Sequence, residues 1–444
     1  MDDWREYNTR MLGSYDLSYL FISANDTLYP VGKFLDSLAY RTLNGNTIAY
    51  QFVSMIFVLG LLLYFQWKLL ILAVKDRLLA SCAFVFTLLM LQPDSYWGLQ
   101  NMAFHQGLPV VGILASIFIL VRPKWNPLWA LPSLFVIGIL SGFSYISGAF
   151  SILTVSLVWL FAAFFTKALE RKRLLYSGLS LLVAGLITSA AQFWVIAVKQ
   201  HGTHRPDAPM GYPWESDFWF YYLGKLGRSL MMPTHYPVTS LVIVLIAVLV
   251  VLAIFWLYFK ELIGKKYQTL DDARPALIYA SIFGAILVYL SLVSAGRVNL
   301  RFADTQSPTE IFIFGFGRFH YFWATVLWPW VAAACFMLCR GLFVSTEKRL
   351  YLRVPIVASL ALATLMICGG SFEHSKYFKK TMVLRSDAIR CIATLLAQRK
   401  DVFCPQVDII SISAAYSFGS ETGASFVKIL PVVPLNPEPN QTSQ

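Results

Sequence analysis

Residues 236–259 read YPVTSLVIVLIAVLVVLAIFWLYF, a stretch of 24 residues without a charged side chain. A helix needs about 20 apolar residues to cross the roughly 30 Å hydrocarbon core of a bilayer, so this stretch predicts a transmembrane helix. The whole chain of 444 residues is 57% apolar, 16% aromatic and only 14% charged, whereas an ordinary soluble domain carries about 25% charged residues. The composition therefore excludes a soluble enzyme, a nucleic-acid-binding protein and a disordered protein. It predicts an all-α polytopic membrane protein.

Ten such stretches divide the chain into three parts. Residues 1–46 form an outer loop, 47–370 form a transmembrane helical domain, and 371–444 form a small tail. The fourth and fifth stretches are short and meet at Ser141-Gly142-Phe143-Ser144, where we expect a tight hairpin. The predicted spans are 47–66, 78–93, 102–121, 128–142, 145–165, 174–197, 236–259, 275–296, 320–339 and 354–370.

The charges in the loops predict which side of the membrane each loop occupies, because Lys and Arg concentrate on the cytoplasmic side. One alternate set of loops is short and carries 17 basic and six acidic residues. The opposite set, without the tail, carries 11 basic and 12 acidic residues. We therefore place the basic set in the cytoplasm and interpret the net charge of +12 as a signal of topology. Residues 1–46, 198–235, 297–319 and the tail then lie outside.

The outer position of residues 1–46 requires an explanation, because no secretory signal or span precedes them. Either the first span translocates its own N-terminus, or a leading helix is missing from this reading of the gene. We favour the missing helix. The charges place the loop outside in either case.

The tail is predicted to be a small α/β unit. Residues 387–399 show the apolar spacing of a helix. Residues 407–413 and 426–433 resemble short strands. Cys391 and Cys404 can form a disulfide if the tail faces an oxidising compartment.

Polar groups inside the predicted spans are few. His105 and Gln106 lie just inside the third span, and Gln192 lies in the sixth. No span carries a ladder of acidic and basic residues of the kind that relays protons or coordinates ions. This pattern counts against a pump or an ion-coupled transporter, and no internal repeat indicates an inverted-repeat carrier. The polar chemistry is concentrated in the outer loops instead.

Acidic residues near the start of the chain form the first candidate cluster. Asp2 and Asp3 stand beside an aromatic residue, and Asp26, Lys33 and Asp36 follow in the same outer loop. A carboxylate at the membrane surface is a natural general base, which makes these residues candidates for catalysis. The alternative is a solvated loop in which residues 23–26 cap a helix that runs from Leu28 onward.

The turn at residues 92–101, with the sequence QPDSYWGLQN, is the second cluster. It holds an acid, amides and aromatic residues close to the bilayer in one short outer loop. Carboxylates and amides above an aromatic plane suit sugar hydroxyls, so we predict a ligand role here. The alternative is that Trp and Tyr serve as ordinary interfacial residues. The candidate substrate-binding residues of this cluster are Asp94, Trp97, Gln100, Asn101 and the neighbouring His105.

The third cluster lies at the outer edge of the ninth span, where Arg318, His320 and Tyr321 enter it. Arg is suited to bidentate bonds with a phosphate, and a lipid-linked phosphate would lie at this depth. The alternative is that Arg reaches up to ordinary phospholipid headgroups. A fourth segment, 201–219, has the composition of a loop that covers a substrate. Its two closely spaced His residues are a weak metal signal, and no metal site is predicted.

Several motifs follow one another along the chain: Asp2-Asp3-Trp4, Asn25-Asp26 with Pro30 and Lys33, the turn at 92–100, the segment from Gly138 to Gly148, and Gly317-Arg318-Phe319-His320-Tyr321. This series resembles a broad group of bacterial polytopic membrane proteins whose layout is similar to that of GT-C glycosyltransferases. The glucosyltransferases that modify O-antigen and convert serotype share this plan and size. The resemblance covers roughly residues 1–340.

The resemblance implies a GT-C-like enzyme that uses a polyprenyl-phosphate sugar as donor, with no cofactor and with a divalent cation left open. It implies Asp3 or Asp2 as the base, Asp26 as a supporting acid and Arg318 as the ligand of the lipid phosphate. The sugar would be glucose. The acceptor would be a cell-surface polysaccharide such as the O-antigen of lipopolysaccharide, or a lipid-linked glycan. The protein would lie among the lipids of the bacterial inner membrane, with its active face in the periplasm.

The residues themselves favour a lipid-linked donor, because no nucleotide site is visible in the sequence. It has no Gly-rich loop that would cradle phosphates, and the cytoplasmic loops are too short to build a nucleotide-binding domain. Three other classes stay open. An O-antigen polymerase would use the arginines of the 297–319 loop. A flippase or transporter of lipid-linked glycans would need a polar path across the membrane. A scaffold protein would use the tail to bind a partner.

Overall fold

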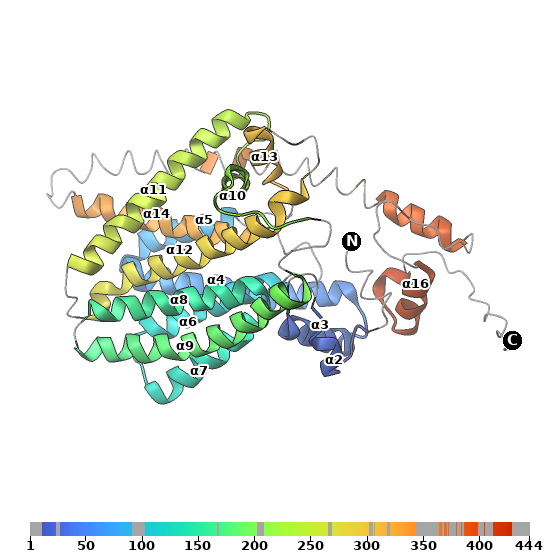
Figure 1. Ribbon diagram of the computed structural model, residues 1–444, viewed down its shortest axis with the longest axis horizontal. Helices are drawn as coiled ribbons and strands as arrows, with labels where there is room; N and C mark the ends of the chain where they lie inside the picture. Colours follow the sequence, from blue (N-terminus) through green and yellow to red (C-terminus); the bar gives the residue numbers. More distant parts are fainter. Residues whose placement is uncertain are drawn as a thin grey trace.

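The computed structural model describes most of the first 342 residues and the centre of the tail. The described residues are 11–23, 27–90, 103–166, 168–201, 208–264, 269–301, 305, 307–317, 320–342, 364–365, 368–370, 372, 379, 383, 386–397, 404 and 412–428. Every regular element in these residues is a helix (Figure 1). The predicted all-α class is therefore confirmed for this part of the chain.

Six helices are long and apolar enough to cross a membrane, and three shorter apolar helices accompany them. The long ones are α4 (Thr47–Val74), α6 (Leu108–Val121) with the preceding π-helical turn η2 (Ala103–Gly107), α8 (Ile146–Phe164), α9 (Ala168–Trp194) with η3 (Val195–Lys199), α11 (Pro237–Gly264), and α12 (Leu270–Arg297) with η4 (Val298–Leu300); the shorter ones are α5 (Arg77–Met90), α7 (Pro127–Gly142) and α14 (Phe322–Leu342). Nine of the ten predicted spans coincide with these helices. The tenth, 354–370, lies almost entirely outside the described residues. Helices of this length and composition are those of a membrane-embedded protein.

The hairpin predicted between the fourth and fifth spans is present. α7 ends at Gly142, and α8 begins at Ile146. A Cβ atom added at Gly148 would overlap the carbonyl oxygen of Ser141, so the close approach of the two helices requires glycine here. Small residues of this kind allow transmembrane helices to pack closely in a bilayer.

Short helices gather at one end of the bundle. α2 (Leu17–Leu20) and α3 (Pro30–Thr42) lie at the ends of the long helices, and α16 (Ile412–Glu421) lies further out (Figure 1). Gln192 of α9 holds the segment before α3, because its side chain accepts a hydrogen bond from Leu28 N (2.9 Å) and donates one to Leu28 O (2.5 Å). A helix start at Leu28 is therefore wrong. The helix begins two residues later, with proline in its first turn.

α3 buries its polar face and exposes apolar side chains. Lys33, Asp36 and Tyr40 are buried, whereas Phe34 and Leu38 are 44% and 40% exposed. This pattern is the reverse of that in a helix on the surface of a soluble protein. The exposed apolar side suits the boundary of a membrane, while the polar side chains find partners inside the protein. α3 therefore brings charged groups to the end of the bundle.

Two further short helices lie beside α11. α10 (Ser216–Ser229) packs on α13 (Pro308–Phe314), and both contact α11. α13 begins with a capping box, in which Ser307 Oγ accepts from Glu310 N and the Glu310 carboxylate accepts from Ser307 N. α10 and α13 belong to the second and third of the large loops that are predicted to lie outside, so the described parts of these two loops lie together.

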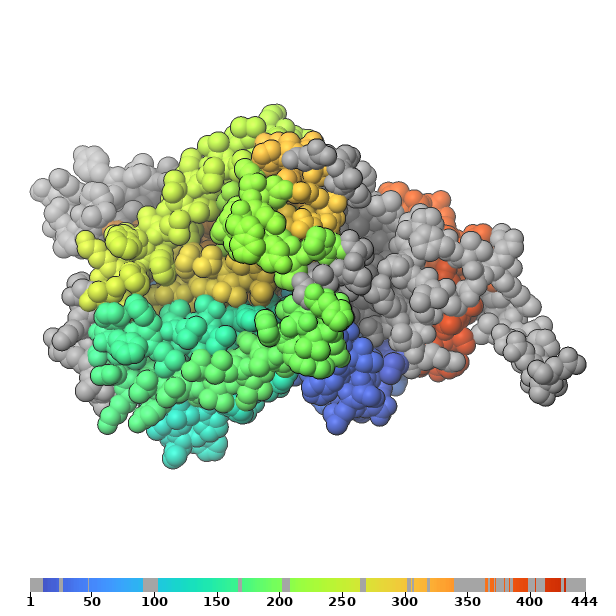
Figure 2. Space-filling view, viewed as in Figure 1, coloured from blue at the N-terminus to red at the C-terminus, as the bar shows by residue number. Residues whose placement is uncertain are grey.

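The described part of the tail forms what we call the C-terminal unit: the helix at 386–397, α16 and the 3-10 turn η6 (Ser425–Lys428). The helix predicted over 387–399 is confirmed for its described residues. Cys391 and Cys404 form a disulfide with an S–S distance of 2.06 Å, as the sequence allowed. Figure 2 shows this unit, in red and orange, at the same end of the molecule as the N-terminal residues in blue.

The two strands predicted in the tail are wrong where the structure describes them. Ile412 and Ser413 belong to α16, and the described start of the second predicted strand lies in η6. The remaining residues of both predicted strands lie outside the described residues. The physical reason for the helix is a repeat of three and four residues rather than two along its buried side. The buried residues are Ile412, Ala415, Tyr416 and Gly419.

Candidate functional site

A carboxylate, an imidazole and a phenol meet at the end of the bundle where α3 lies. We call them the α3 cluster: Asp36 of α3, Tyr50 of α4 and His105 of η2. His105 Nε2 lies 2.6 Å from Asp36 Oδ2, and the Tyr50 hydroxyl donates a hydrogen bond to Asp36 Oδ1. The three residues are 7%, 4% and 5% exposed. A buried carboxylate is costly unless it is hydrogen-bonded, and these two bonds meet that requirement.

The surroundings of His105 fix the orientation of its ring. η2 is a π-helical turn, a feature often found at functional sites. The ring packs on Tyr29 with centroids 4.5 Å apart, and a Cβ atom at Gly32 would lie 2.5 Å from His105 Cδ2. An ionised carboxylate can only accept a hydrogen bond, so we assign Nε2 as the donor to Asp36. Nδ1 then carries the ring lone pair that can accept a proton.

Lys33 lies one turn before Asp36 and ties α2 to α3. Its Nζ donates hydrogen bonds to Tyr19 O (3.1 Å) and Ile22 O (2.9 Å). The ammonium also lies 4.7 Å from the ring centroid of Tyr19 and 5.2 Å from that of Tyr29, a favourable cation–π arrangement. These contacts hold the first half of α3 in place. Lys33 therefore helps to fix the position of Asp36, which lies one turn later in the same helix.

Two buried basic residues form a second group, the α10 cluster: Lys225 and Arg228 of α10 with Tyr321. Lys225 is fully buried, and Arg228 is 3% exposed. Lys225 Nζ donates a hydrogen bond to Gly317 O, and the Arg228 guanidinium carbon lies 4.6 Å from the ring centroid of Tyr321. A buried charge is stable only when it is paired or hydrogen-bonded. Gly317 and Tyr321 flank Arg318, which itself lies outside the described residues.

A hydrogen bond connects the neighbourhoods of the two clusters. Trp323 Nε1 donates to Gln106 O (3.1 Å), and Trp323 stacks on Tyr289 with centroids 4.4 Å apart. Gln106 follows His105 in the chain, and Trp323 comes two residues after Tyr321. The starts of the third and ninth predicted spans are therefore adjacent.

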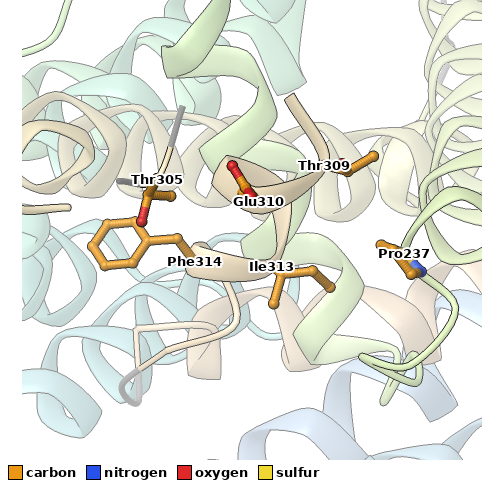
Figure 3. Close-up of a pocket in the computed structure, with 6 residues that line it drawn as sticks. All are labelled: Pro237, Thr305, Thr309, Glu310, Ile313 and Phe314. Carbon is orange, nitrogen blue, oxygen red and sulfur yellow. The ribbon is translucent and has the colours of Figure 1, made fainter. Parts of the chain in front are cut away.

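An open pocket of about 360 Å³ lies along α13 (Figure 3). Its lining is mainly apolar and includes Phe314 together with the polar residues Thr305, Thr309 and Glu310. Carboxylate, hydroxyl and apolar faces together suit a ligand that carries several hydroxyl groups. The buried residues of α13 face the protein instead, and the helix packs there on α10. The full lining is Pro237, Thr305, Thr309, Glu310, Ile313 and Phe314.

The described residues among the predicted site residues are buried. His105, His320 and Tyr321 are 5%, 3% and 1% exposed. His105 belongs to the α3 cluster and Tyr321 to the α10 cluster, and His320 directly precedes Tyr321. The other predicted site residues lie outside the described residues: Asp2, Asp3, Asp26, Asp94, Trp97, Gln100, Asn101 and Arg318.

Sequence reasoning included Asp36 in the first candidate cluster but did not name it as a catalytic residue, and it did not consider its partner Tyr50. A signal was present, because Lys33, Asp36 and Tyr40 follow one another at helical spacing on one face of α3. No comparable signal marks Lys225, whose burial depends on the packing of α10 against α13.

A metal site needs several ligands on converging side chains. Among the described residues, no group of three or more His, Cys, Asp and Glu side chains is arranged in this way.

No protein-family model, curated protein or solved structure matches the chain.

Proposed function

We propose that this protein is a GT-C-like membrane glycosyltransferase. It transfers a sugar, expected to be glucose, from a polyprenyl-phosphate donor to a cell-surface polysaccharide such as O-antigen or to a lipid-linked glycan. The reaction takes place on the periplasmic face of the bacterial inner membrane. The observation that carries the proposal is the buried contact between Asp36 and His105 at the end of the bundle where α3 and the C-terminal unit lie.

The α3 cluster supports a role in proton transfer. An imidazole oriented by a carboxylate on one nitrogen is a recurrent general base. Asp36 receives hydrogen bonds on both carboxylate oxygens, so it orients His105 and stabilises the imidazolium that forms. The resemblance predicts Asp3 or Asp2 as the base instead. The variants described below distinguish that assignment from the assignment of His105.

The proposed reaction is a direct displacement. His105 Nδ1 accepts the proton of an acceptor hydroxyl, whose oxygen attacks the anomeric carbon of the donor sugar. The bond between that carbon and the phosphate oxygen breaks, and polyprenyl phosphate leaves with a negative charge. Lys225 and Arg228, together with Arg318, supply positive charge that stabilises the leaving phosphate. The pocket along α13 holds the hydroxyl groups of the acceptor.

The proposal includes the predicted topology of ten spans with the large loops outside. Two observations support it. α10 and α13, from two separate predicted outer loops, pack on each other. The disulfide in the C-terminal unit suits an oxidising compartment, which the periplasm is.

The test measures transfer of sugar by the purified protein in lipid vesicles that contain polyprenyl-phosphate glucose and lipopolysaccharide. We expect Asp36→Asn and His105→Gln to lower the rate at least about 100-fold, the size of a general-base contribution. Gln at position 105 keeps a donor near Nε2 but has no basic nitrogen, so it separates catalysis from structural support. Asp16→Asn, in an exposed part of the same outer loop, is the matched control. The double variant Asp2→Asn with Asp3→Asn tests the base that the resemblance implies.

Transfer at a normal rate by His105→Gln would contradict the role of the α3 cluster. Loss of transfer only in the double variant would move the base to Asp2 or Asp3. If the unaltered chain transfers no sugar from any polyprenyl-phosphate donor, the proposal fails. Polymerisation of lipid-linked repeats or movement of a lipid-linked glycan across the vesicle would then be measured in its place.

A further inference from the structure

The C-terminal unit packs against the second half of α3. The hydroxyl of Tyr40 donates a hydrogen bond to Thr422 Oγ1, and the Tyr40 ring stacks on Phe418 with centroids 6.3 Å apart and planes inclined by 12°. Tyr40 belongs to the same apolar core as the buried residues of the C-terminal unit. Burial raises the pKa of the Tyr40 phenol, and the hydrogen bond to Thr422 lowers it by less. The phenol therefore stays protonated and donates at neutral pH.

Two turns also fit together beside this contact. Gly45, in the turn between α3 and α4, has φ +67°, and a Cβ atom there would lie 3.0 Å from Thr422 O. Gly423 has φ +70°, and its Cβ atom would lie 3.6 Å from Asn44 O. Positive φ values favour glycine, and so does the close approach at Gly45. The end of α16 is therefore seated on the turn that follows α3.

α3 is held from two sides, and Asp36 lies between them. The first half is held by the bundle, where Val31 N donates to Phe143 O (3.1 Å), and by α2 and the residues after it, where Lys33 bonds to two carbonyls. The C-terminal unit holds the second half through Tyr40. Asp36 and Tyr40 are one turn apart, so both side chains lie on the same face. A displacement of the second half of α3 therefore moves Asp36 relative to His105.

The disulfide stabilises the unit that holds Tyr40. Among the described residues, the core of this unit is small, and Ile392, Leu396 and Tyr416 belong to it. A core of this size rarely suffices by itself, and small units are commonly stabilised by disulfides. Cys404 is buried in the same core, and its bond to Cys391 attaches the helix at 386–397 to the rest of the unit.

We propose that the C-terminal unit positions α3, and that formation of the Cys391–Cys404 disulfide is required to complete the α3 cluster. The effect on catalysis rests on the proposed function; the effect on α3 does not. The two thiols lose two protons and two electrons when the bond forms. The electrons pass to the disulfide of a thiol oxidoreductase in the outer compartment, which is reduced to a dithiol. Tyr40 and Thr422 are positioning residues in this scheme.

Hydrogen exchange of the full chain in lipid nanodiscs tests the structural part. In the oxidised protein we expect slow exchange throughout residues 31–42. After reduction, or in the double variant Cys391→Ser with Cys404→Ser, residues 37–42 exchange at least about tenfold faster, because local opening controls exchange. α8 and α9 keep their protection. Cys368→Ser is the matched control, since it removes an exposed thiol that is not part of the disulfide. Unchanged exchange in residues 37–42 after full reduction of the disulfide would overturn the inference.

Substitutions at Tyr40 test the link to the site without altering the disulfide. Tyr40→Phe keeps the ring on Phe418 and retains most of the protection of α3, whereas Tyr40→Ala loses it. In the transfer assay, Tyr40→Ala lowers kcat about tenfold with little change in the KM of either substrate, and Tyr40→Phe restores most of it. Equal kcat values for Tyr40→Ala and the unaltered chain would contradict the positioning role. Loosened exchange in a chain without transferase activity would support the structural inference and refute only the proposed function.

Discussion

At Gly32 the absence of a side chain allows α3 to lie directly against the His105 ring. A Cβ atom would lie 2.5 Å from Cδ2 and 2.9 Å from Nε2, the atom that contacts Asp36. The ring therefore has no room to turn toward α3. The orientation of the imidazole depends on a position that has no functional group of its own.

We expect Gly32→Ala to displace the ring and to lower the rate of transfer about 10- to 100-fold, because small misplacements of a catalytic group have effects of this size. Its cost in stability is about 1–3 kcal/mol, the usual range for overpacking. The assay described above and thermal unfolding measure the two effects. Gly60→Ala in α4 is the control, since no atom lies within 4 Å of its added Cβ. A fully active Gly32→Ala variant would show that the ring orientation is unimportant.

Glu310 tests the pocket along α13. Glu310→Gln removes the charge but keeps the shape and the capping box, which either residue can form. We expect the KM for the acceptor to rise about tenfold, in line with the loss of a hydrogen bond to a charged group, while the KM for the lipid-linked donor stays the same. A rise in the donor KM alone would place the donor sugar in this pocket instead.

Asp36 also shows how far residue-level prediction reaches. The sequence marks outer acidic residues as candidates, and the structure shows that Asp36, at the far end of the same loop, is buried. Its partners Tyr50 and His105 are 14 and 69 residues away in the chain. Only the packing of α3 across α4 and η2 brings them together, and no spacing in the sequence encodes that packing.

At the scale of elements, the hairpin of α7 and α8 is a tightly constrained feature of the bundle. It was predictable because two short apolar stretches meet at a Ser-Gly-Phe-Ser sequence. The nine apolar helices were predictable for a similar reason, since an apolar block of about 20 residues forms a helix in a bilayer. The secondary structure of the tail was harder to predict, because its short apolar runs fit a strand as well as a helix. The spacing of Ile412 and Ala415 indicates a helix only once the packing of these residues is known.

Gly148→Ala should disrupt this hairpin. The new Cβ would overlap Ser141 O, and backbone atoms cannot move aside as a flexible side chain can. We expect a loss of stability of at least about 1–3 kcal/mol, seen as a lower midpoint in thermal unfolding in detergent. The same Gly60→Ala variant serves as the reference. Equal midpoints for the two variants would mean that the helices separate more easily than their packing indicates.

For the whole molecule, the loop charges predict that α3 and the C-terminal unit lie outside. Labelling of intact spheroplasts with a membrane-impermeant maleimide measures this. Asp16→Cys should be labelled and Lys124→Cys should not, because both positions are exposed but belong to loops of opposite predicted sidedness. After lysis both variants should be labelled. The reverse pattern would invert the topology and place the α3 cluster on the cytoplasmic side.

The contact between Tyr40 and Thr422 joins residues that are 382 positions apart. During translation, α3 emerges among the first helices, and α16 emerges after every helix of the bundle. The bundle can therefore insert into the membrane before this contact forms. Formation of the contact is slow, because its residues are far apart in the sequence. A chain interrupted before residue 412 has its bundle helices but not the partner of Tyr40. The second half of the helix that carries Asp36 therefore gains its contacts with Phe418 and Thr422 only after nearly the whole chain has been made.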